Sequence, residues 1–291
     1  MIGAPTPQIG AVVLTQGRRP AELAAALASL SAQRGVEIEV VVVGNGWSPS
    51  GLPAGVNAVA LAEDRGIPAG RNAGVSSVSG ELLFFLDDDA RLAAPDALAA
   101  VAARFAADPS LGLLQLRVDA SEGGVPPRDW VPRLRVGDRT RSSDVTAVWE
   151  GAVAIRRSVF EAVGGWPDEF VRGHEGIDLA WRVLDAGSRV AYAGDNAVLH
   201  PAYVTAPHER SVYYGARNRV WLARRNLPLP LGVLYVAGFM LRTLPVLRSR
   251  ARARAALRGY RDGLRLDCGP RRRLRARTLW RMTRNGRPPV I

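Results

Sequence analysis

Short apolar runs alternate with helical patterns along the first half of the chain. The apolar runs predict buried strands over residues 9–14, 37–43, 56–61, 82–86 and 112–118. Helical periodicity between them predicts helices over residues 20–34, 68–78 and 95–107. This alternation is typical of an α/β fold, in which a mostly parallel sheet is flanked by helices on both faces. Ligands of such sheets bind beyond the carboxyl ends of the strands.

The alternation breaks in the middle of the chain. Residues 120–144 are rich in Pro, Gly, Arg and Asp without a clear period, so we expect a long surface excursion there. Strands are then predicted over 148–155, 189–193 and 197–200, with helices over 158–163 and 178–186. A change of character after Pro207 predicts a first domain over residues 1–226 and a second over residues 227–291.

The composition narrows the class of protein. With 47% hydrophobic residues, 7% aromatic residues and a mean hydropathy of −0.01, the chain is neither disordered nor a multi-pass membrane protein. Its single cysteine, Cys268, excludes an intrachain disulfide and indicates a reducing compartment. The first residues show no secretory signal, so we expect a cytoplasmic protein. Since there are only three histidines, a metal site would depend mainly on carboxylates.

The net charge of +12 is concentrated at one end of the chain. Residues 242–291 hold 16 arginines and two acids, so the rest of the chain is close to neutral. The uncharged stretch over 227–241 is shorter than the roughly 20 residues that a membrane span needs. Beyond it, arginines recur at helical spacing beside an apolar stripe at Leu257, Tyr260 and Leu264. This basic helical extension suits an anionic membrane surface, which predicts a peripheral position at the inner face of the plasma membrane.

One other interpretation of the extension stays open. It could pack on the body of the protein and leave a solvated basic face. Binding to nucleic acid is not expected, because few exposed aromatic residues alternate with the arginines.

Three aspartates, Asp87, Asp88 and Asp89, directly follow the apolar strand over 82–86. Carboxylates so close together repel one another unless a cation neutralises them or water surrounds them. Hard divalent cations prefer such oxygen ligands. The alternatives are a solvated acidic turn or an N-cap of the helix near Pro95. The position at a strand end favours a metal site.

Several segments together resemble the nucleotide-sugar domain of family 2 glycosyltransferases, which have the GT-A fold. The first are residues 12–15, 40–43, 65–74 and 80–89, and the match continues through residues 149–152, 163–166 and 174–182. Each segment alone is weak evidence, but their order and spacing make the set specific. The resemblance covers roughly residues 9–201.

This resemblance implies a metal site and a donor site. Asp87 and Asp89 would occupy the Asp-x-Asp positions and bind Mg²⁺ or Mn²⁺ at the diphosphate, and His200 would complete the metal site. The residues implied to bind a UDP- or dTDP-linked donor are Thr15, Asn45, Arg71, Asp87 and Asp88. The sequence departs from the family pattern twice, because Gly44-Asn45-Gly46 lacks an acid and because Gly176 replaces an acid beside Glu175.

Inverting transfer needs a carboxylate that takes the proton of the acceptor hydroxyl. Glu175 is the first candidate, and Asp178, three residues later, could share its helical face. Either acid could instead serve the N-terminus of the helix, as a cap or through the helix dipole. Trp149 and Trp181 could form a platform for an acceptor sugar, although tryptophans at such spacing also occur in cores.

These observations predict a metal-dependent, inverting glycosyltransferase. It would move a sugar from a nucleotide-sugar donor to a hydroxyl of a lipid-linked or cell-envelope glycan acceptor. One alternative is an inactive transferase-like protein that binds membranes or nucleic acid, with Gly44 and Gly176 as lesions. Another is a nucleotidyltransferase, but its Gly/Lys-rich phosphate loop is hard to find in a chain without lysine.

Overall fold

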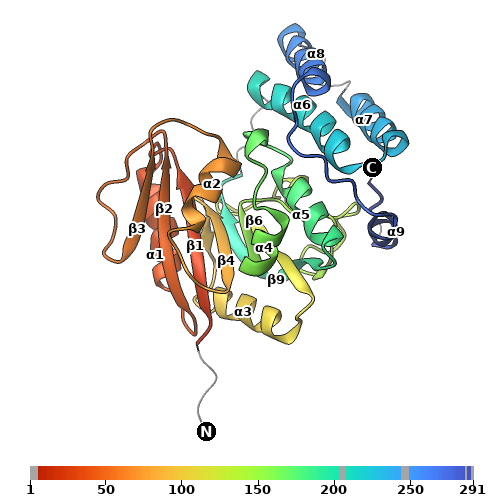
Figure 1. Cartoon of the computed structure of the whole chain (residues 1–291). Coiled ribbons are helices and arrows are strands. Elements are labelled where there is room, and N and C mark those ends of the chain that lie inside the picture. Colours follow the sequence, from red (N-terminus) through yellow and green to blue (C-terminus); the bar gives the residue numbers. More distant parts are fainter. Residues whose placement is uncertain (1–5, 203–207, 244–248, 286, 290–291) are drawn as a thin grey trace.

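A computed structural model describes residues 6–202, 208–243, 249–285 and 287–289 (Figure 1). Within these ranges one sheet has the strand order β3-β2-β1-β4-β8-β6-β9-β5, and β7 also pairs with β9. The strands are β1 (Gln8–Thr15), β2 (Glu37–Asn45), β3 (Val56–Leu61), β4 (Leu82–Asp87), β5 (Arg91–Leu92), β6 (Leu111–Ala120), β7 (Ser143–Asp144), β8 (Ala152–Arg156) and β9 (Arg189–His200). The helices are α1 (Pro20–Ser31), α2 (Ile67–Val75), α3 (Ala97–Ala107), α4 (Arg157–Val163), α5 (Glu175–Asp185), α6 (Glu209–Asn226), α7 (Leu229–Thr243), α8 (Arg250–Arg265) and α9 (Ala276–Arg284).

The first four strands of this order, β3, β2, β1 and β4, are all parallel. Their carboxyl ends therefore meet at one edge, where Leu14 pairs with Asp87 and Thr15 pairs with Gly44. β8 runs antiparallel between β4 and β6, and β6 and β9 are again parallel. The predicted α/β fold with a mostly parallel sheet is confirmed.

Helices cover both faces of the sheet (Figure 1). Alternate residues of the strands point to opposite faces. On one face Ala11 and Val13 pack with apolar side chains of α1 and α3. On the other face Val12 packs with apolar side chains of α4 and α5. β4 is buried along Leu82–Leu86, so it lies in the middle of the fold and ends at the aspartates.

Some predicted boundaries move in the structure. α5 begins at Glu175, three residues before the predicted start, so this acid lies in the first turn of the helix. The two short strands predicted over residues 189–193 and 197–200 form one strand, β9, with a register shift opposite Leu116 and Arg117. This irregular stretch is held by the buried amide of Asn196, which donates to the carbonyl of Ala97 over 2.8 Å.

Two of the C-terminal helices, α7 and α8, pack on α6 (Figure 1). α8 approaches α6 closely because Gly259 and Gly263 face it, and a Cβ at Gly263 would lie 2.7 Å from the Cβ of Val220. The chain then returns to the body, where the Arg275 amide donates to Asp185 over 2.8 Å. The division of the chain at residue 226 stays a prediction. Among the helices of the described ranges, none is long and apolar enough to cross a membrane.

Candidate active site

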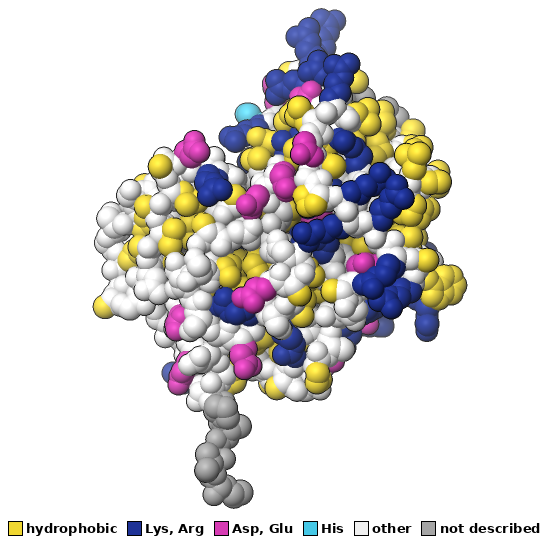
Figure 2. All heavy atoms as spheres, viewed as in Figure 1, with side chains coloured by type: hydrophobic (Ala, Val, Ile, Leu, Met, Phe, Trp, Pro, Cys, Tyr) yellow, Lys and Arg dark blue, Asp and Glu magenta, His cyan; other side chains and the backbone are white. Residues whose placement is uncertain are grey.

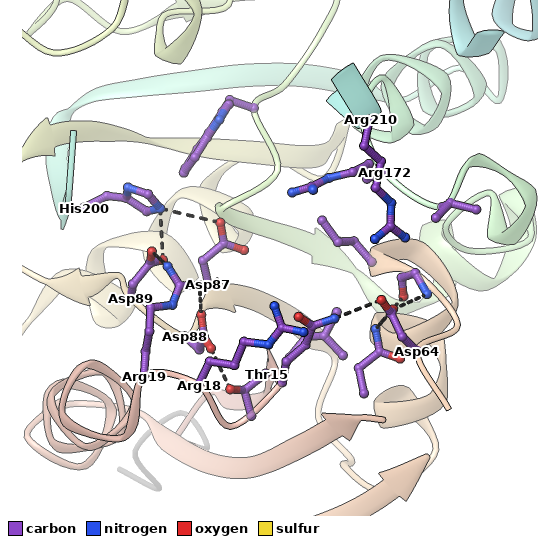
Figure 3. A pocket seen from close by; sticks show the side chains of 17 residues that line it. Thr15, Arg18, Arg19, Asp64, Asp87, Asp88, Asp89, Arg172, His200 and Arg210 are labelled. Carbon is purple, nitrogen blue, oxygen red and sulfur yellow. Dashed lines mark hydrogen bonds and ion pairs between the residues drawn. The ribbon is translucent and has the colours of Figure 1, made fainter. Parts of the chain in front are cut away.

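A cavity of about 660 Å³ opens where the parallel strands end (Figure 3). The predicted site residues that line it are Thr15, Asn45, Asp87, Asp88, Asp89, Trp149 and His200. The other predicted residues, Arg71, Glu175, Asp178 and Trp181, are not among those that line it. The strand ends thus bring most of the predicted donor and metal residues into one place.

Asp87, Asp89 and His200 form a cluster that could hold a metal ion, with one ligand atom of each within 4.8 Å of the others. His200 ends β9, and its Nε2 lies 3.1 Å from Asp89 Oδ1 and 3.8 Å from Asp87 Oδ2. Burial alone would lower the pKa of His200, but bonds to and charges of both aspartates outweigh it and raise the pKa to about 10. The imidazolium therefore supplies the positive charge that this acidic cluster needs. In its neutral form the imidazole, with the two carboxylates, is also a suitable donor set for Mn²⁺.

Asp88 points away from this cluster toward β1 (Figure 3). The hydroxyl of Thr15 donates to Asp88 Oδ2 over 2.6 Å, and Arg19 forms an ion pair with Asp88 Oδ1 over 2.6 Å. Arg19 also pairs with Asp89. The sequence indicated Arg19 only as the residue before a helix, yet it neutralises two of the three aspartates.

Asn45 also lines the cavity, and both ends of its side-chain amide are held by hydrogen bonds. Its Nδ2 donates to Asp64 Oδ1 over 2.8 Å, and its Oδ1 accepts from the Arg65 amide over 2.8 Å. Asp64 lines the cavity and also accepts from Gln16 over 2.9 Å. Sequence reasoning missed Asp64, which supplies an acidic group close to the turn after β2, where the expected acid is absent.

Arg71 projects from α2 and is 3% exposed. Its Nη2 donates to Asp87 Oδ1 over 2.6 Å, and its guanidinium lies 5.2 Å from the centre of the Trp166 ring. Burial acts to raise the pKa of Asp87, but the bond from His200 and the charge of Arg71 lower it to about 2. Arg71 thus contacts the metal cluster from behind and does not reach into the cavity.

Glu175 begins α5 and is 2% exposed. Its Oε2 is buried without a hydrogen-bond partner among the described residues. Burial and the nearby charge of Glu150 raise the pKa of Glu175 to about 8. Glu150 is a second acid close to Glu175. It was not named as a candidate from the sequence, although residues 149–152 were part of the family resemblance.

Asp178 lies in a buried ion-pair network. It is completely buried and accepts from Arg182 over 2.7 Å and from Asn226 over 2.8 Å. Arg182 also donates to the carbonyl of Val163 over 2.6 Å. The structure therefore places Asp178 where it joins α5 to α6 and leaves it no access to an acceptor.

The two predicted tryptophans lie in different environments. Trp149 lines the cavity, and its ring lies 5.1 Å from the His200 ring in an edge-on arrangement. Its backbone is held by the buried Gln115, which accepts from the Trp149 amide over 2.7 Å. Trp181 is 3% exposed and packs on Tyr235 in the core. The structure brings only Trp149 to the cavity.

The segment before α5 has an unusual backbone that α6 holds in place. Val171 and His174 have φ values of 63° and 72°, which residues other than glycine rarely adopt. The buried amide of Asn218 donates to the carbonyls of Phe170, Arg172 and Gly173 over 2.7–2.9 Å. This contact positions Arg172 at the cavity.

Three arginines that the sequence did not single out, Arg18, Arg172 and Arg210, line the cavity. Figure 3 shows Arg172 and Arg210 together on the side opposite Arg18. The cavity therefore combines an acidic metal cluster with several cationic side chains, a combination that suits a phosphate-bearing ligand with a divalent cation.

Both departures from the family pattern are explained by packing. A Cβ at Gly44 would meet the carbonyl oxygen of Trp47. A Cβ at Gly176 would meet the carbonyl oxygen of Val148 and would lie 2.7 Å from Glu150 Oε1. Each glycine is therefore required by a close approach of its surroundings, which argues against these positions being lesions.

The parallel sheet, its helical layers and the aspartates at the end of β4 define a glycosyltransferase domain of the GT-A fold. The chain belongs to glycosyl transferase family 2, whose family model matches residues 11–164. The predicted family and fold are therefore confirmed.

Curated relatives resemble only part of the chain. The "Pre-mycofactocin glycosyltransferase" of Mycobacterium tuberculosis is 29% identical over 169 residues, which cover 55% of this chain and 33% of that protein. The "O-antigen chain rhamnosyltransferase WbaN" of Salmonella anatum is 38% identical over 61 residues, 21% of this chain and 19% of that protein. The matches thus span a third or less of the length of these relatives.

Solved structures share the fold over most of the chain. GalNAc-T7 with UDP, GalNAc and Mn²⁺ has a TM-score of 0.64 at 14% identity and covers 90% of this chain and 56% of that chain. TarS of S. aureus, residues 1–349, has a TM-score of 0.60 at 16% identity, and the match covers 89% of this chain and 81% of that chain. The mannosyltransferase PcManGT from Pyrobaculum calidifontis, with GDP-Man and Mn²⁺, has a TM-score of 0.56 at 20% identity, and the match covers 88% of this chain and 74% of that chain.

Proposed function

We propose that the protein transfers a sugar from a nucleotide-sugar donor to an acceptor hydroxyl, in a metal-dependent and inverting reaction. The observation that carries this proposal is the cluster of Asp87, Asp89 and His200 at the edge of the cavity. The family match supports the glycosyl-transfer chemistry.

Asp87, Asp89 and His200 would hold the metal, and Mn²⁺ or Mg²⁺ would offset the charge of the donor diphosphate. Two of the structural neighbours contain Mn²⁺, which supports a divalent ion at the corresponding edge of the fold. Arg18, Arg172 and Arg210 add positive charge around the same cavity. Such charges stabilise the diphosphate that leaves when the sugar is transferred.

The nucleoside would lie toward Thr15 and Asp64, which line the cavity beyond the metal cluster (Figure 3), and toward Asn45, which donates to Asp64. Neighbours of known structure bind UDP, UDP-GlcNAc or GDP-Man. The carboxylate of Asp64 and the Asn45 carbonyl can accept an N–H of a pyrimidine base. We therefore favour a UDP- or dTDP-linked donor.

The acceptor would be a cell-envelope glycan or a lipid-linked sugar that approaches over Trp149. An O-antigen rhamnosyltransferase among the relatives supports this class of acceptor. Inversion follows from a single displacement, in which a carboxylate beside the donor takes the proton of the attacking hydroxyl. Two acids stand at the N-terminus of α5, Glu175, which is the candidate from the sequence, and Glu150, and one of them would take this role.

The C-terminal helices would bring the enzyme to the inner face of the plasma membrane. α7 exposes apolar side chains, among them Leu229 at 72% and Leu241 at 68%, and α8 carries the densest arginines. Figure 2 shows basic and hydrophobic side chains side by side over this end of the molecule. Apolar residues next to arginines suit a surface of anionic lipids.

Binding of nucleotides to the full chain tests this function. Thermal unfolding would be followed with UDP, dTDP and GDP, each with and without Mn²⁺ or Mg²⁺. We expect one nucleotide to raise the melting temperature clearly, and only with a divalent ion, because ligands of the folded state stabilise it in proportion to their occupancy. The proposal fails if no nucleotide stabilises the protein at saturating metal.

A further inference from the structure

Glu150 and Gly176 are fitted to each other. The Gly176 amide, in the first turn of α5, donates to Glu150 Oε1 over 2.7 Å. A side chain at position 176 would occupy the space that the Glu150 carboxylate fills, because a Cβ there would lie 2.7 Å from both Glu150 Cγ and Oε1. The glycine therefore both bonds Glu150 and makes room for it.

The two acids at this position, Glu150 and Glu175, have unequal environments. Glu175 is 2% exposed and its Oε2 has no partner within the described parts of the chain, whereas Glu150 is partly exposed and accepts a backbone N–H. An N–H at a helix N-terminus stabilises a carboxylate. Loss of contact with water raises the pKa of both acids, and the Gly176 N–H opposes this only at Glu150. Two neighbouring carboxyls in such surroundings do not both ionise easily, so they share one proton. The environments assign that proton to Glu175 and the negative charge to Glu150.

Glu150 also lies between two residues that belong to the site. Trp149, which precedes it, lines the cavity. The carbonyl of Gly151, which follows it, accepts from the Asp87 amide over 3.0 Å, and a Cβ at Gly151 would lie 2.6 Å from Asp87 Oδ2. The backbone on either side of Glu150 is therefore fixed at the cavity and at the aspartate that the metal site uses.

We propose that Glu150, paired with Gly176, is the catalytic base that receives the acceptor proton, while the protonated Glu175 positions it. This inference rests on the proposed function. In the transfer step the acceptor O–H bond breaks and its proton moves to Glu150 Oε2. The acceptor oxygen bonds to the anomeric carbon, and the bond from that carbon to the phosphate oxygen breaks, so the nucleoside diphosphate leaves with the electron pair.

Three glutamate-to-glutamine variants of the full chain test the assignment. Glutamine at position 150 can still accept from Gly176, so Glu150→Gln should fold and bind nucleotide normally. Glu161→Gln is the matched control, because Glu161 is an acid on α4 with 61% of its side chain exposed. Release of nucleoside diphosphate would be measured with UDP-GlcNAc and a dTDP-linked sugar, with Mn²⁺ present and water as the acceptor.

We expect kcat to fall by a factor on the order of 100 or more in Glu150→Gln, with KM nearly unchanged, since a general base contributes rate and not donor affinity. Glu175→Gln mimics a protonated acid and should keep kcat within about tenfold. Glu161→Gln should match the native chain. Retained turnover in Glu150→Gln, or an equal or greater loss in Glu175→Gln, would overturn the assignment while leaving the proposed function intact.

Infrared spectroscopy covers the case in which neither donor is hydrolysed. At neutral pH the absorption of a protonated carboxyl should be lost in Glu175→Gln and retained in Glu150→Gln. The opposite result would overturn the division of roles. Failure of the proposed function gives a different result, since no nucleotide would then bind in the presence of metal.

Discussion

His200 Nε2 lies 3.1 Å from Asp89 Oδ1, and this contact joins the end of β9 to the turn after β4. Asp87 completes the group from the end of β4 itself. Three ligands from two strands therefore meet where the parallel strands end. A rigid sheet holds such ligands more precisely than a loop would.

Replacement of Asp89 by Asn should separate metal binding from folding. The amide keeps the shape of the side chain but removes the charge that a divalent ion needs, so we expect nucleotide affinity with Mn²⁺ to fall at least about tenfold. Affinity without metal should change little. Isothermal titration with and without Mn²⁺ measures both, and Asp195→Asn, at an exposed aspartate on the surface, is the control. Equal affinities in the native chain and Asp89→Asn would remove Asp89 from the metal site.

Glu175 should make the protein less stable as the pH rises. Its pKa in the folded chain is about 8 and its usual value is 4.5, because burial and Glu150 oppose its charge more than Arg71 favours it. The folded state therefore keeps a proton that the unfolded state loses above its usual pKa. Stability is lost as the pH rises between these values, and the full loss is present above the folded pKa.

Glu175→Gln removes this titration. Relative to the native chain, the variant should gain on the order of 2 kcal/mol in free energy of unfolding between about pH 5 and about pH 8.5. Urea unfolding at the two pH values measures the gain. A constant difference between the two proteins would show that Glu175 is ionised in the folded state. Asp87 also faces this pair and is unchanged in the comparison.

Arg71 should be needed for stability as well as for the site. It is 3% exposed, pairs with Asp87 and acts on Glu150 and Glu175 with its charge. Arg71→Leu leaves these acids without that charge, and we expect the free energy of unfolding to fall by about 2–3 kcal/mol at neutral pH and by less in acid.

Arg104→Leu serves as the control for Arg71, because it removes a partly exposed pair with Asp195. Surface ion pairs contribute about 1 kcal/mol or less, so the control should lose little stability. Chemical unfolding measures the free energy of unfolding of both variants. Equal losses would mean that the buried charge of Arg71 stabilises the fold no more than an exposed ion pair does.

The part of the site that the sequence predicts lies where the apolar strands end. Asp87, Asp89 and Thr15 each end or follow an apolar run, and parallel strands bring their carboxyl ends together. Local patterns therefore placed the aspartates at a strand end, whereas His200 and Thr15 were implied by the family resemblance. The spacing of Asp178 and Arg182, four residues apart in a helix, also indicates the ion pair that buries Asp178 in the structure.

The rest depends on contacts between distant segments. Glu150 meets Gly176 only because the segment before β8 lies against the first turn of α5, and no periodicity in either segment shows this. Asp64 follows a weak strand pattern, so its place beside Asn45 could not be read locally. Trp181 fits a helix equally well on a core face or an outer face, and packing on Tyr235 decides its position.

Asn218 should control the shape of the segment before α5. It is completely buried, and its amide donates to three carbonyls of residues 170–173. Asn218→Ala removes these three bonds, and within the described residues only the Phe170 carbonyl keeps another side-chain donor, Arg217. We therefore expect a loss of about 2 kcal/mol or more in free energy of unfolding and a higher KM for the donor, because Arg172 would lose its position. Asn57→Ala is a control, since Asn57 makes one exposed bond to Ser77. An unchanged KM would show that this segment does not bind the donor.

Binding to anionic membranes should depend on the exposed apolar side chains of α7. Leu234 and Leu241 are 57% and 68% exposed, and the arginines of α8 lie on the neighbouring helix. The double variant Leu234→Ser and Leu241→Ser removes apolar contact without removing charge, so binding to phosphatidylglycerol vesicles should weaken about tenfold or more. Val125→Ser is a matched control, because Val125 is 94% exposed outside the C-terminal helices and should not affect binding. Vesicle sedimentation measures each protein, and raised salt should also weaken the native chain, since it screens attraction between arginines and lipid headgroups. Equal sedimentation of the double variant and the native chain would show that α7 does not contact the membrane.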